Sequence, residues 1–383
     1  MASHVKDILL VGSGAVGAIY ALVLKQSGLA RVTAVARSNY SLIEKEGIHF
    51  QSGKYGNISG WMPDRLCRSV AEAADRHYSY VMITTKSVPE VMKTSTILAP
   101  FLSPEYTSRF PQPTYVFLQN GLNVEGDTYH AVKALGKGEP SIVTSALYIG
   151  TNLNAPNVVE HNDFNRLALG VYRHENYTAT ENSPEEASLL QDIGNILEKG
   201  GATISIVPEI QRVKFSKNFW NVAFSSIATL TQYTLPAIFR SPPRYSSESY
   251  TPYVSDTTAD LINAFTIPTI TAIMEEMLAV GRALGFPDSP EGLPSSSVSG
   301  TLERTRVLHI TADSIHVPSM LLDARQRRPI EVEVIVGEVV RMARAHNVPV
   351  PRIETLYALL LVVQNQILRE MESKTTRVPI HGE

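Results

Sequence analysis

The stretch ILLVGSGAVG, residues 8–17, decides the fold of the N-terminal half of this chain. It places three glycines in the pattern G-x-G-x-x-G, directly after a short apolar run and before a helical pattern. The first glycine of such a unit allows a tight turn, the second lets the backbone approach a pyrophosphate, and the third lets helix and strand pack closely. The free N–H groups at the helix start then favour phosphate. We therefore expect a dinucleotide site formed by Gly12, Ser13, Gly14, Ala15, Val16 and Gly17.

The end of the second expected strand, residues 31–36, bears on the choice of cofactor. An Asp or Glu at this point usually holds the ribose 2′-hydroxyl of NAD. Here the strand is followed by Arg37, and no acidic residue comes before Glu44. A guanidinium can hold a 2′-phosphate through two parallel charge-assisted hydrogen bonds. We therefore expect NADPH as the cofactor, the alternative being that Arg37 is an ordinary solvated surface residue.

Strand-like and helix-like segments alternate through the first third of the chain. The apolar runs at 80–85 and 115–118 indicate further strands, and a helix is expected between them over 90–102. Such alternation is typical of a parallel sheet with crossover helices. Short β-like pieces follow, together with a helix over 183–199 that has Ser183 as its N-cap.

The strand signals largely stop after residue 207, and apolar residues then recur at helical spacing. The helical segments are 214–232, 258–284, 319–347 and 352–372. We therefore predict an α/β Rossmann-type N-terminal domain with a parallel-rich sheet, residues 1–207, followed by an all-α C-terminal domain, residues 208–383. Two segments, 241–255 and 287–298, are rich in Ser and Pro and are expected to be loops.

Composition argues against several classes of function. The 383 residues carry 34 Lys and Arg against 37 Asp and Glu, a net charge of −3 that gives no electrostatic case for nucleic acid or an anionic membrane. The single cysteine, Cys67, excludes a disulfide framework, and no metal-ligand spacing is found. We read no signal peptide and no membrane-spanning run, so a cytoplasmic protein is expected. A homodimer is expected only from the general frequency of dimers.

A second candidate site lies on the helical segment KNFWNVAF, residues 217–224. Lys217 and Asn221 are four residues apart, so both project from one face of a helix. A ketone that accepts a hydride develops negative charge on its oxygen, which a nearby ammonium can stabilise and protonate. The alternative is that these two side chains belong to a solvated helix face.

Four separated pieces of the chain resemble the ketopantoate reductase family, and together they span most of it. They are GSGAVG at 12–17, QNGLN at 119–123, KNFWNVAF at 217–224 and PSMLLDARQRRPIEVEVIVGE at 318–338. The segment AHNVPVPRIETLYALL, residues 345–360, is similar to the C-terminal part of that family. The resemblance implies NADPH-dependent reduction of 2-dehydropantoate, a small 2-oxo acid, to pantoate in pantothenate biosynthesis.

The resemblance also implies roles for individual residues of the C-terminal half. Lys217 matches the family's general acid, and Asn221 matches a neighbouring amide that binds the substrate. Glu331 matches a catalytic-site glutamate, and Ser319 matches a serine that contacts the substrate carboxylate. Without the resemblance, Glu331 is better interpreted as a salt-bridge partner of Arg327 or Arg328.

Two residues of the N-terminal half gain roles in the same way. Asn120, which follows a strand, matches a residue between the nicotinamide side of the cofactor and the substrate. Lys86, which ends the stretch YVMITTK, matches a cofactor-side lysine. Without the resemblance, Asn120 reads as a turn residue and Lys86 as a charge at a strand end.

The chain departs from the family pattern in places that leave the substrate open. Ser225 stands where the family often has a second substrate-binding Asn, and a serine cannot make the same two-ended hydrogen bonds. Pro329 and Ile330 stand where Gly or Arg and Thr are common. The chain is also longer than typical members, mainly at 103–113, 173–184 and 241–255. The alternatives are another 2-oxo acid or ketone, another dehydrogenase type with a helical second domain, or a non-catalytic NADPH-binding protein.

Overall fold

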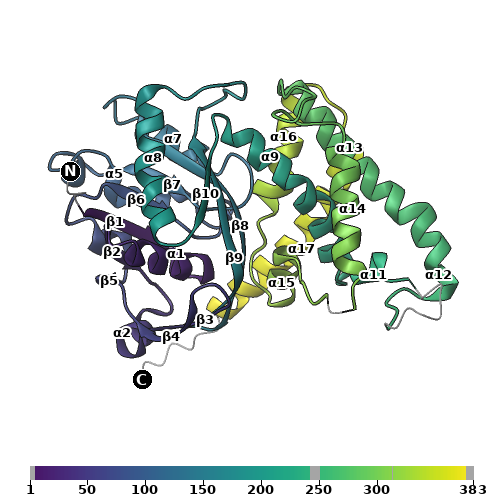
Figure 1. The fold of residues 1–383 in the computed structure, drawn as a ribbon, viewed down its shortest axis with the longest axis horizontal. Coiled ribbons are helices and arrows are strands. Elements are labelled where there is room, and N and C mark those ends of the chain that lie inside the picture. Colours follow the sequence, from purple (N-terminus) through teal and green to yellow (C-terminus); the bar gives the residue numbers. More distant parts are fainter. Residues whose placement is uncertain (1–4, 242–250, 313, 377–383) are drawn as a thin grey trace. The chain divides into compact units, whose positions relative to one another are not determined.

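The computed structural model describes residues 5–241, 251–312 and 314–376, with side chains as far as residue 373. The chain forms two compact units, Met1–Lys214 and Phe215–Glu383 (Figure 1). The sequence placed a domain boundary at 207/208, ahead of helix α9 (Ile210–Trp220), whereas the observed boundary falls inside that helix. The first five residues of α9, 210–214, therefore belong to the first unit.

The described part of the first unit is built on one mixed sheet of ten strands. The strands are β1 (Lys6–Val11), β2 (Ala30–Val35), β3 (Ile48–Ser52), β4 (Gly56–Trp61), β5 (Arg65–Cys67), β6 (Tyr80–Ile83), β7 (Thr114–Phe117), β8 (Ile142–Ala155), β9 (Val158–Val171) and β10 (Thr203–Ile206). Their order across the sheet is β4-β3-β9-β8-β7-β6-β1-β2-β5, and β10 pairs with β9.

The strands β5-β2-β1-β6-β7-β8 form a parallel core in this order. The chain enters at β1, adds β2 and β5 on one side, and then crosses to add β6, β7 and β8 on the other. This is the doubly wound Rossmann order, in which ligands bind beyond the carboxyl ends of the strands near the point of reversal. The predicted fold class is confirmed, and the point of reversal lies between β1 and β6.

Eight helices accompany this sheet among the described residues. They are α1 (Ala15–Gln26), α2 (Tyr40–Glu46), α3 (Val70–Ala73), α4 (Thr94–Ile97), α5 (Ala99–Leu102), α6 (Pro104–Thr107), α7 (Gly126–Lys133) and α8 (Pro184–Lys199). Helix α1 contacts both the sheet and α8, which lie beside it in Figure 1. Because it is covered on both sides, every residue from Gly17 to Leu24 is buried, which explains its almost wholly apolar sequence.

Local sequence explains where several elements begin and end. Helix α8 begins with the predicted cap, because the Ser183 side chain accepts from the Glu186 N–H while the Glu186 carboxylate accepts from the Ser183 N–H. The helix expected over 90–102 is wrong in its extent: the structure has two single turns, α4 and α5. Pro100 is the second residue of α5, where its missing N–H costs nothing, but it could not continue the first turn.

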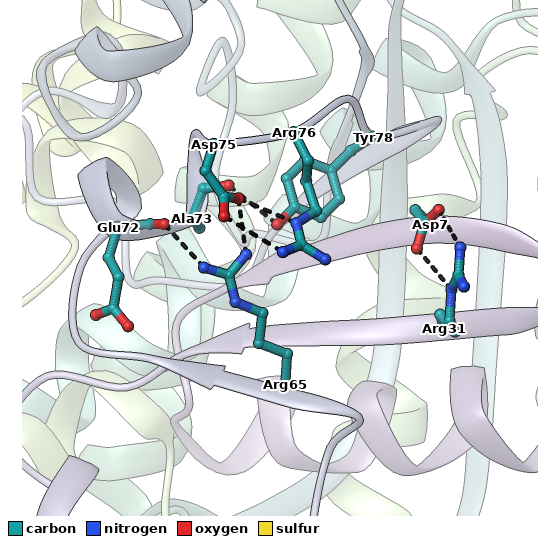
Figure 2. A network of polar contacts seen from close by, with 8 residues as sticks. All are labelled: Asp7, Arg31, Arg65, Glu72, Ala73, Asp75, Arg76 and Tyr78. Carbon is teal, nitrogen blue, oxygen red and sulfur yellow. Dashed lines mark hydrogen bonds and ion pairs between the residues drawn. The ribbon is translucent and has the colours of Figure 1, made fainter.

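Two groups of charged side chains lie near this side of the sheet, one joining the edge strand β5 to the loop after α3 and the other joining β1 to β2 (Figure 2). Asp75 accepts from Arg65 at 2.8 Å and from Arg76 at 3.0 Å. The hydrogen bond from Arg76, followed by that from Arg65, lowers the pKa of Asp75 to about 2. At the amino ends of β1 and β2, Arg31 donates two hydrogen bonds to Asp7, at 2.9 and 2.7 Å.

The described residues of the second unit form helices joined by loops and contain no strand. Its elements after α9 are η1 (Asn221–Ser225), α10 (Ser226–Thr231), α11 (Pro236–Phe239), α12 (Asp256–Leu261), η2 (Ile262–Thr266), α13 (Ile267–Ala283), α14 (Ser297–Ile310), α15 (Ser319–Arg325), η3 (Glu333–Gly337), α16 (Glu338–Ala345) and α17 (Pro351–Thr376), where η marks π-helical turns. The helix expected over 319–347 is interrupted at residues 326–331, where Pro329 cannot supply a helical N–H. Residues 242–250 of the expected loop 241–255 lie outside the described residues.

One helical stretch of the second unit, Asp256–Ala283, is long and apolar enough to cross a membrane by length and composition alone. It is the only such stretch among the described residues, and 39% of its apolar window is buried in the protein. A core helix passes the same test, and α13 buries Ile270, Met274 and Met277. The finding is therefore weak evidence for a membrane span.

Candidate functional site

The turn between β1 and α1 has the backbone that the glycine motif predicts. Gly12 has a φ of +110°, and a Cβ there would lie 2.9 Å from Thr85. A Cβ on Gly17 would lie 1.8 Å from the Gly12 carbonyl oxygen, so this glycine lets the helix pack against the turn. At Gly14, by contrast, a Cβ would meet nothing within 4 Å. The first and third glycines serve the fold, whereas the second faces open space.

That open space lies at the start of α1 and suits a pyrophosphate. Gly14 is the N-cap of α1 and supplies no side-chain cap, and the first turn contains no acidic residue. The N–H groups of that turn therefore point outward without a competing carboxylate. An anion approaching Gly14 would meet these donors and the positive end of the helix dipole. The residues present thus fit a dinucleotide.

Side chains around the glycine turn fix its position. The Thr84 hydroxyl donates to the Gly12 carbonyl at 2.7 Å. The Ser13 hydroxyl donates to the Val35 carbonyl at 3.0 Å, and the Asn39 amide donates to the Ser13 carbonyl at 2.9 Å. Ser13 therefore ties the turn to the end of β2, where Arg37 follows.

The other predicted cofactor residues follow the carboxyl ends of neighbouring strands. Arg37 comes after β2, Lys86 after β6 and Asn120 after β7, and the order of these strands is β2-β1-β6-β7. The Gln119 amide donates to the Thr85 carbonyl at 2.8 Å, which ties the segment after β7 to the one after β6. The glycine turn, Arg37, Lys86 and Asn120 are thus brought to one edge of the sheet.

The second unit gathers the residues predicted for substrate chemistry. Lys217 lies in the last turn of α9, and Asn221 begins η1 directly after it. Both side chains are half-buried, as is that of Trp220 between them. Ser225 differs from them, because only 1% of it is exposed and its hydroxyl has no hydrogen-bond partner among the described residues. Solvent therefore reaches Lys217 and Asn221 but not the Ser225 hydroxyl.

Two further predicted residues lie on elements that pack against η1. Helix α15, which begins at Ser319, and the turn η3 both contact η1. Glu331 is buried two residues before η3, and its carbonyl accepts from the N–H of Ile335 within that turn. The Asn218 amide donates to the Ile335 carbonyl at 2.8 Å. This bond joins the helix of Lys217 and Asn221 to the segment of Glu331.

Both π-helical turns that meet here adjoin predicted functional residues. The turn η1 spans Asn221 and Ser225, while η3 follows Glu331. Single π-turns inside α-helices are rare and occur frequently at functional sites. The loop before Ser319 also approaches this region, since the ring centroids of His316 and Trp220 are 5.5 Å apart.

Sequence reasoning missed two features of these sites. Glu125 and Lys214 form a buried ion pair, to which the Thr144 hydroxyl donates a hydrogen bond. Glu125 lies five residues after Asn120, and Lys214 lies three residues before Lys217. No local pattern links two charges so distant in the sequence. Arg68 follows β5 beside the end of β2, and it was also missed, because the three-residue strand β5 has too short an apolar signal to place its end.

The arginines near Glu331 make ion pairs of their own. Arg328 pairs with Asp323 at 3.0 Å, and Arg327 pairs with Glu370 at 3.7 Å. In the described part of the chain, no group of three His, Cys, Asp or Glu side chains is arranged to hold a metal ion.

Comparison with protein families decides the relationship of this chain. The family model described as ketopantoate reductase PanE/ApbA matches residues 8–174, and the model of the C-terminal part of the same family matches residues 251–364. The chain belongs to the ketopantoate reductase family. The first match contains the glycine turn, Arg37, Lys86 and Asn120, and the second contains Ser319 and Glu331.

Individual relatives of this ketopantoate reductase family member are distant but cover almost its full length. An uncharacterized protein of Saccharomyces cerevisiae is 24% identical over 373 residues, covering 94% of each chain. A 2-dehydropantoate 2-reductase of a Nostoc species is 21% identical over 360 residues, covering 91% of this chain and 92% of the relative.

Solved structures share the fold. The 2-dehydropantoate 2-reductase of Methylococcus capsulatus superposes with a TM-score of 0.70 at 24% identity, covering 94% of this chain and 97% of that one. A D-mandelate dehydrogenase in ternary complex with NADH and anilino(oxo)acetate gives 0.69 at 16% identity, covering 94% and 99%. Proteins that share this fold therefore carry the names of two different enzymes, and one of them is solved with NADH.

Proposed function

We propose that this chain reduces the keto group of a 2-oxo acid to a hydroxyl with NADPH, and that the substrate is 2-dehydropantoate, which becomes pantoate. The observation that carries the proposal is the glycine turn, where the N–H groups of α1 face open space at Gly14 while Arg37 follows the neighbouring strand. Family membership supports the same activity.

The chemistry needs one hydride and one proton. Bound NADPH supplies the hydride to the carbonyl carbon. Lys217 donates the proton to the carbonyl oxygen, whose negative charge its ammonium stabilises as the bond order falls. Asn221 donates a hydrogen bond to the substrate, and the Ser319 hydroxyl donates to its carboxylate. Glu331 accepts from the distal hydroxyl of the substrate or favours the charged form of Lys217.

The remaining predicted residues complete this proposal. Lys86 lies on the cofactor side, and Asn120 contacts both the nicotinamide side and the substrate. Ser225 is the predicted substrate-binding residue that the fold supports least, because its hydroxyl is buried. We place Ser225 behind Asn221, which lies four residues earlier on the same helical face. From there, the Ser225 hydroxyl forms a hydrogen bond with the substrate only if the turn η1 rearranges.

A second substrate class is favoured by one observation. Trp220 is half-buried beside Asn221, and its ring meets that of His316 in the loop before Ser319. Two rings next to the proposed substrate-binding residues offer an apolar surface to a bulky or aromatic 2-oxo acid. Phenylglyoxylate is the simplest probe of this class.

The test follows the near-ultraviolet absorbance of NADPH in the presence of 2-dehydropantoate, and then with phenylglyoxylate and short aliphatic 2-oxo acids. Turnover of 2-dehydropantoate that is abolished in Lys217→Ala supports the proposal. Turnover of another acid alone keeps the chemistry and replaces the substrate. Tight NADPH binding without turnover across the panel would contradict the catalytic proposal and favour a non-catalytic NADPH-binding protein.

A further inference from the structure

A second arginine lies at the edge of the sheet where the cofactor's adenosine half is expected. Strand β5 runs parallel to β2 with Val35 opposite Cys67, and the Ala36 N–H donates to the Cys67 carbonyl at 3.0 Å. Neighbouring strands are about 4.8 Å apart. Arg68, which follows Cys67, and Arg37, which follows Ala36, therefore leave the carboxyl ends of adjacent strands within one residue of the same level, and both are exposed.

The side chain of Arg68 is held toward the segment that follows Arg37. Its guanidinium lies over the ring of Tyr40, with its carbon 4.4 Å from the ring centroid. Tyr40 in turn belongs to the turn that Arg37 opens, since the Tyr40 N–H donates to the Arg37 carbonyl at 3.3 Å. One face of the Arg68 guanidinium is thus fixed by an aromatic ring, and part of its N–H edge interacts with the Tyr40 hydroxyl, which leaves the remaining N–H groups for a ligand.

The carboxylates nearest to this pair are engaged by other donors. Glu44 accepts from the Tyr40 hydroxyl at 2.7 Å, and Glu72 accepts from the backbone N–H of Arg68 at 2.8 Å. The guanidinium of Arg37 makes no hydrogen bond or ion pair within the described part of the chain. Two guanidinium groups therefore lie at this corner, and the Tyr40 hydroxyl, followed by the charges of Glu44 and Glu72, raises the pKa of Arg68.

We propose that Arg68 joins Arg37 in holding the 2′-phosphate of NADPH, with Tyr40 as the ring that positions Arg68. A phosphate monoester carries about −1.5 to −2 charges near neutral pH and presents three acceptor oxygens, so it can satisfy two guanidinium groups at once. The 2′-hydroxyl of NADH is uncharged and offers a single oxygen, so it cannot balance the two guanidinium groups. The pair therefore makes this chain selective for NADPH, and this inference rests on the dinucleotide site of the proposed function.

The test measures binding rather than turnover. The full-length chain is titrated with NADPH and, separately, with NADH, following the fluorescence of the reduced nicotinamide. Arg68→Gln is expected to weaken NADPH binding about ten-fold or more, the effect of one hydrogen bond to a charged group, and to leave NADH binding within about two-fold. Arg68→Lys keeps the charge but loses the planar guanidinium, so its affinity for NADPH should fall between those of the wild type and Arg68→Gln. The double variant Arg68→Gln/Arg37→Gln should bind NADPH no tighter than NADH.

Arg31→Gln is the matched control. Arg31 lies at the opposite end of β2, is exposed and pairs with Asp7 (Figure 2). Losing its charge should leave both affinities unchanged. Equal weakening of NADPH and NADH by Arg68→Gln would overturn the proposal, because Arg68 would then act on a part that both cofactors share. Unchanged affinities would overturn it as well. If the wild-type chain bound neither dinucleotide, that result would instead contradict the proposed dinucleotide site on which this inference rests.

Discussion

The side-chain amide of Asn218 donates a 2.8 Å hydrogen bond to the backbone carbonyl of Ile335, and both residues are buried. Asn218 follows Lys217 in α9, whereas Ile335 lies in the π-helical turn η3, four residues after Glu331. A carbonyl within a π-turn is displaced from the ordinary helical ladder, which makes it available to a side chain from another helix. This bond therefore fixes the proposed general acid's helix against the segment of the proposed catalytic glutamate.

Replacing Asn218 by Ala is expected to lower the stability of the second unit by about 1–3 kcal/mol, since the buried Ile335 carbonyl loses its side-chain donor. Because the two segments lose their register, kcat should also fall, by about ten-fold, with a smaller change in the affinity for NADPH. Thermal unfolding and steady-state kinetics measure the two effects. Asn263→Ala, at an exposed asparagine of η2, is the control that should change neither. A stable and fully active Asn218→Ala variant would refute this role.

The three glycines of the turn should separate folding from cofactor binding. Gly14 has a φ of −78° that any residue can adopt, and a Cβ there meets nothing within 4 Å. Gly14→Ala should therefore keep its melting temperature while NADPH binding weakens about ten-fold or more, because the methyl group occupies the path of the pyrophosphate. Gly17→Ala should lower the melting temperature, since its Cβ would lie 1.8 Å from the Gly12 carbonyl oxygen. Undiminished NADPH binding by Gly14→Ala would argue against this site.

The buried pair of Glu125 and Lys214 should respond differently to single and double substitution. Glu125→Ala or Lys214→Met leaves one charge buried without its partner, which is expected to cost about 3–5 kcal/mol. Replacing both at once with Leu and Met should restore much of that loss, because no unpaired charge remains. Since Lys214 lies one helical turn before Lys217, the single variants should also lower kcat. Chemical unfolding of the three variants provides the comparison.

The exposed pair of Lys133 and Glu139 is the control for this cycle. Its side chains are 46% and 72% exposed, so Glu139→Ala should leave the free energy of unfolding almost unchanged. If Glu125→Ala cost as little as Glu139→Ala, the buried pair would not anchor α9.

Stability of the second unit should depend on pH through His309. Burial, followed by the nearby charges of His316 and Arg240, lowers the pKa of His309 to about 4. A histidine in the unfolded chain has a pKa of about 6.5. Below about that pH, the unfolded chain therefore binds a proton that the folded chain does not. The free energy of unfolding then falls as the pH drops toward about 4. When the pH is lowered from about 7.5 to about 5, the free energy of unfolding of His309→Phe should therefore fall by about 2 kcal/mol less than that of the wild type, as measured by chemical unfolding. Parallel losses in both proteins would contradict the buried neutral state of His309.

Patterns that are local in sequence predicted the parallel core and the cofactor edge. The apolar runs of β1, β2, β6 and β7 are each fully covered in a doubly wound sheet, so they read as uninterrupted strands. Gly12 and Gly17 are required by backbone geometry that the motif alone encodes. The cap of α8 was equally visible, because Ser183 and its partner are only three residues apart.

The features that escaped prediction depend on contacts between distant residues. The strands β8 and β9 pair over most of their length, but their outer parts are half-exposed and therefore lack a continuous apolar signal. A π-turn such as η1 has the same composition as the α-helix around it. The partners Glu125 and Lys214 are 89 residues apart, so only the fold brings their charges together. Roles within the site came from the family resemblance, since one sequence cannot distinguish a catalytic lysine from a surface lysine.

The most direct test of the central claim is to follow the transferred hydride. NADPH carrying deuterium at the transferable C4 position of the nicotinamide is incubated with 2-dehydropantoate and the full-length chain, and the product is examined by NMR and mass spectrometry. We predict pantoate with a single deuterium at C2, formed by the wild type and not by Lys217→Ala. Binding of NADPH without any deuterated 2-hydroxy acid, from this substrate or from phenylglyoxylate, would contradict the account.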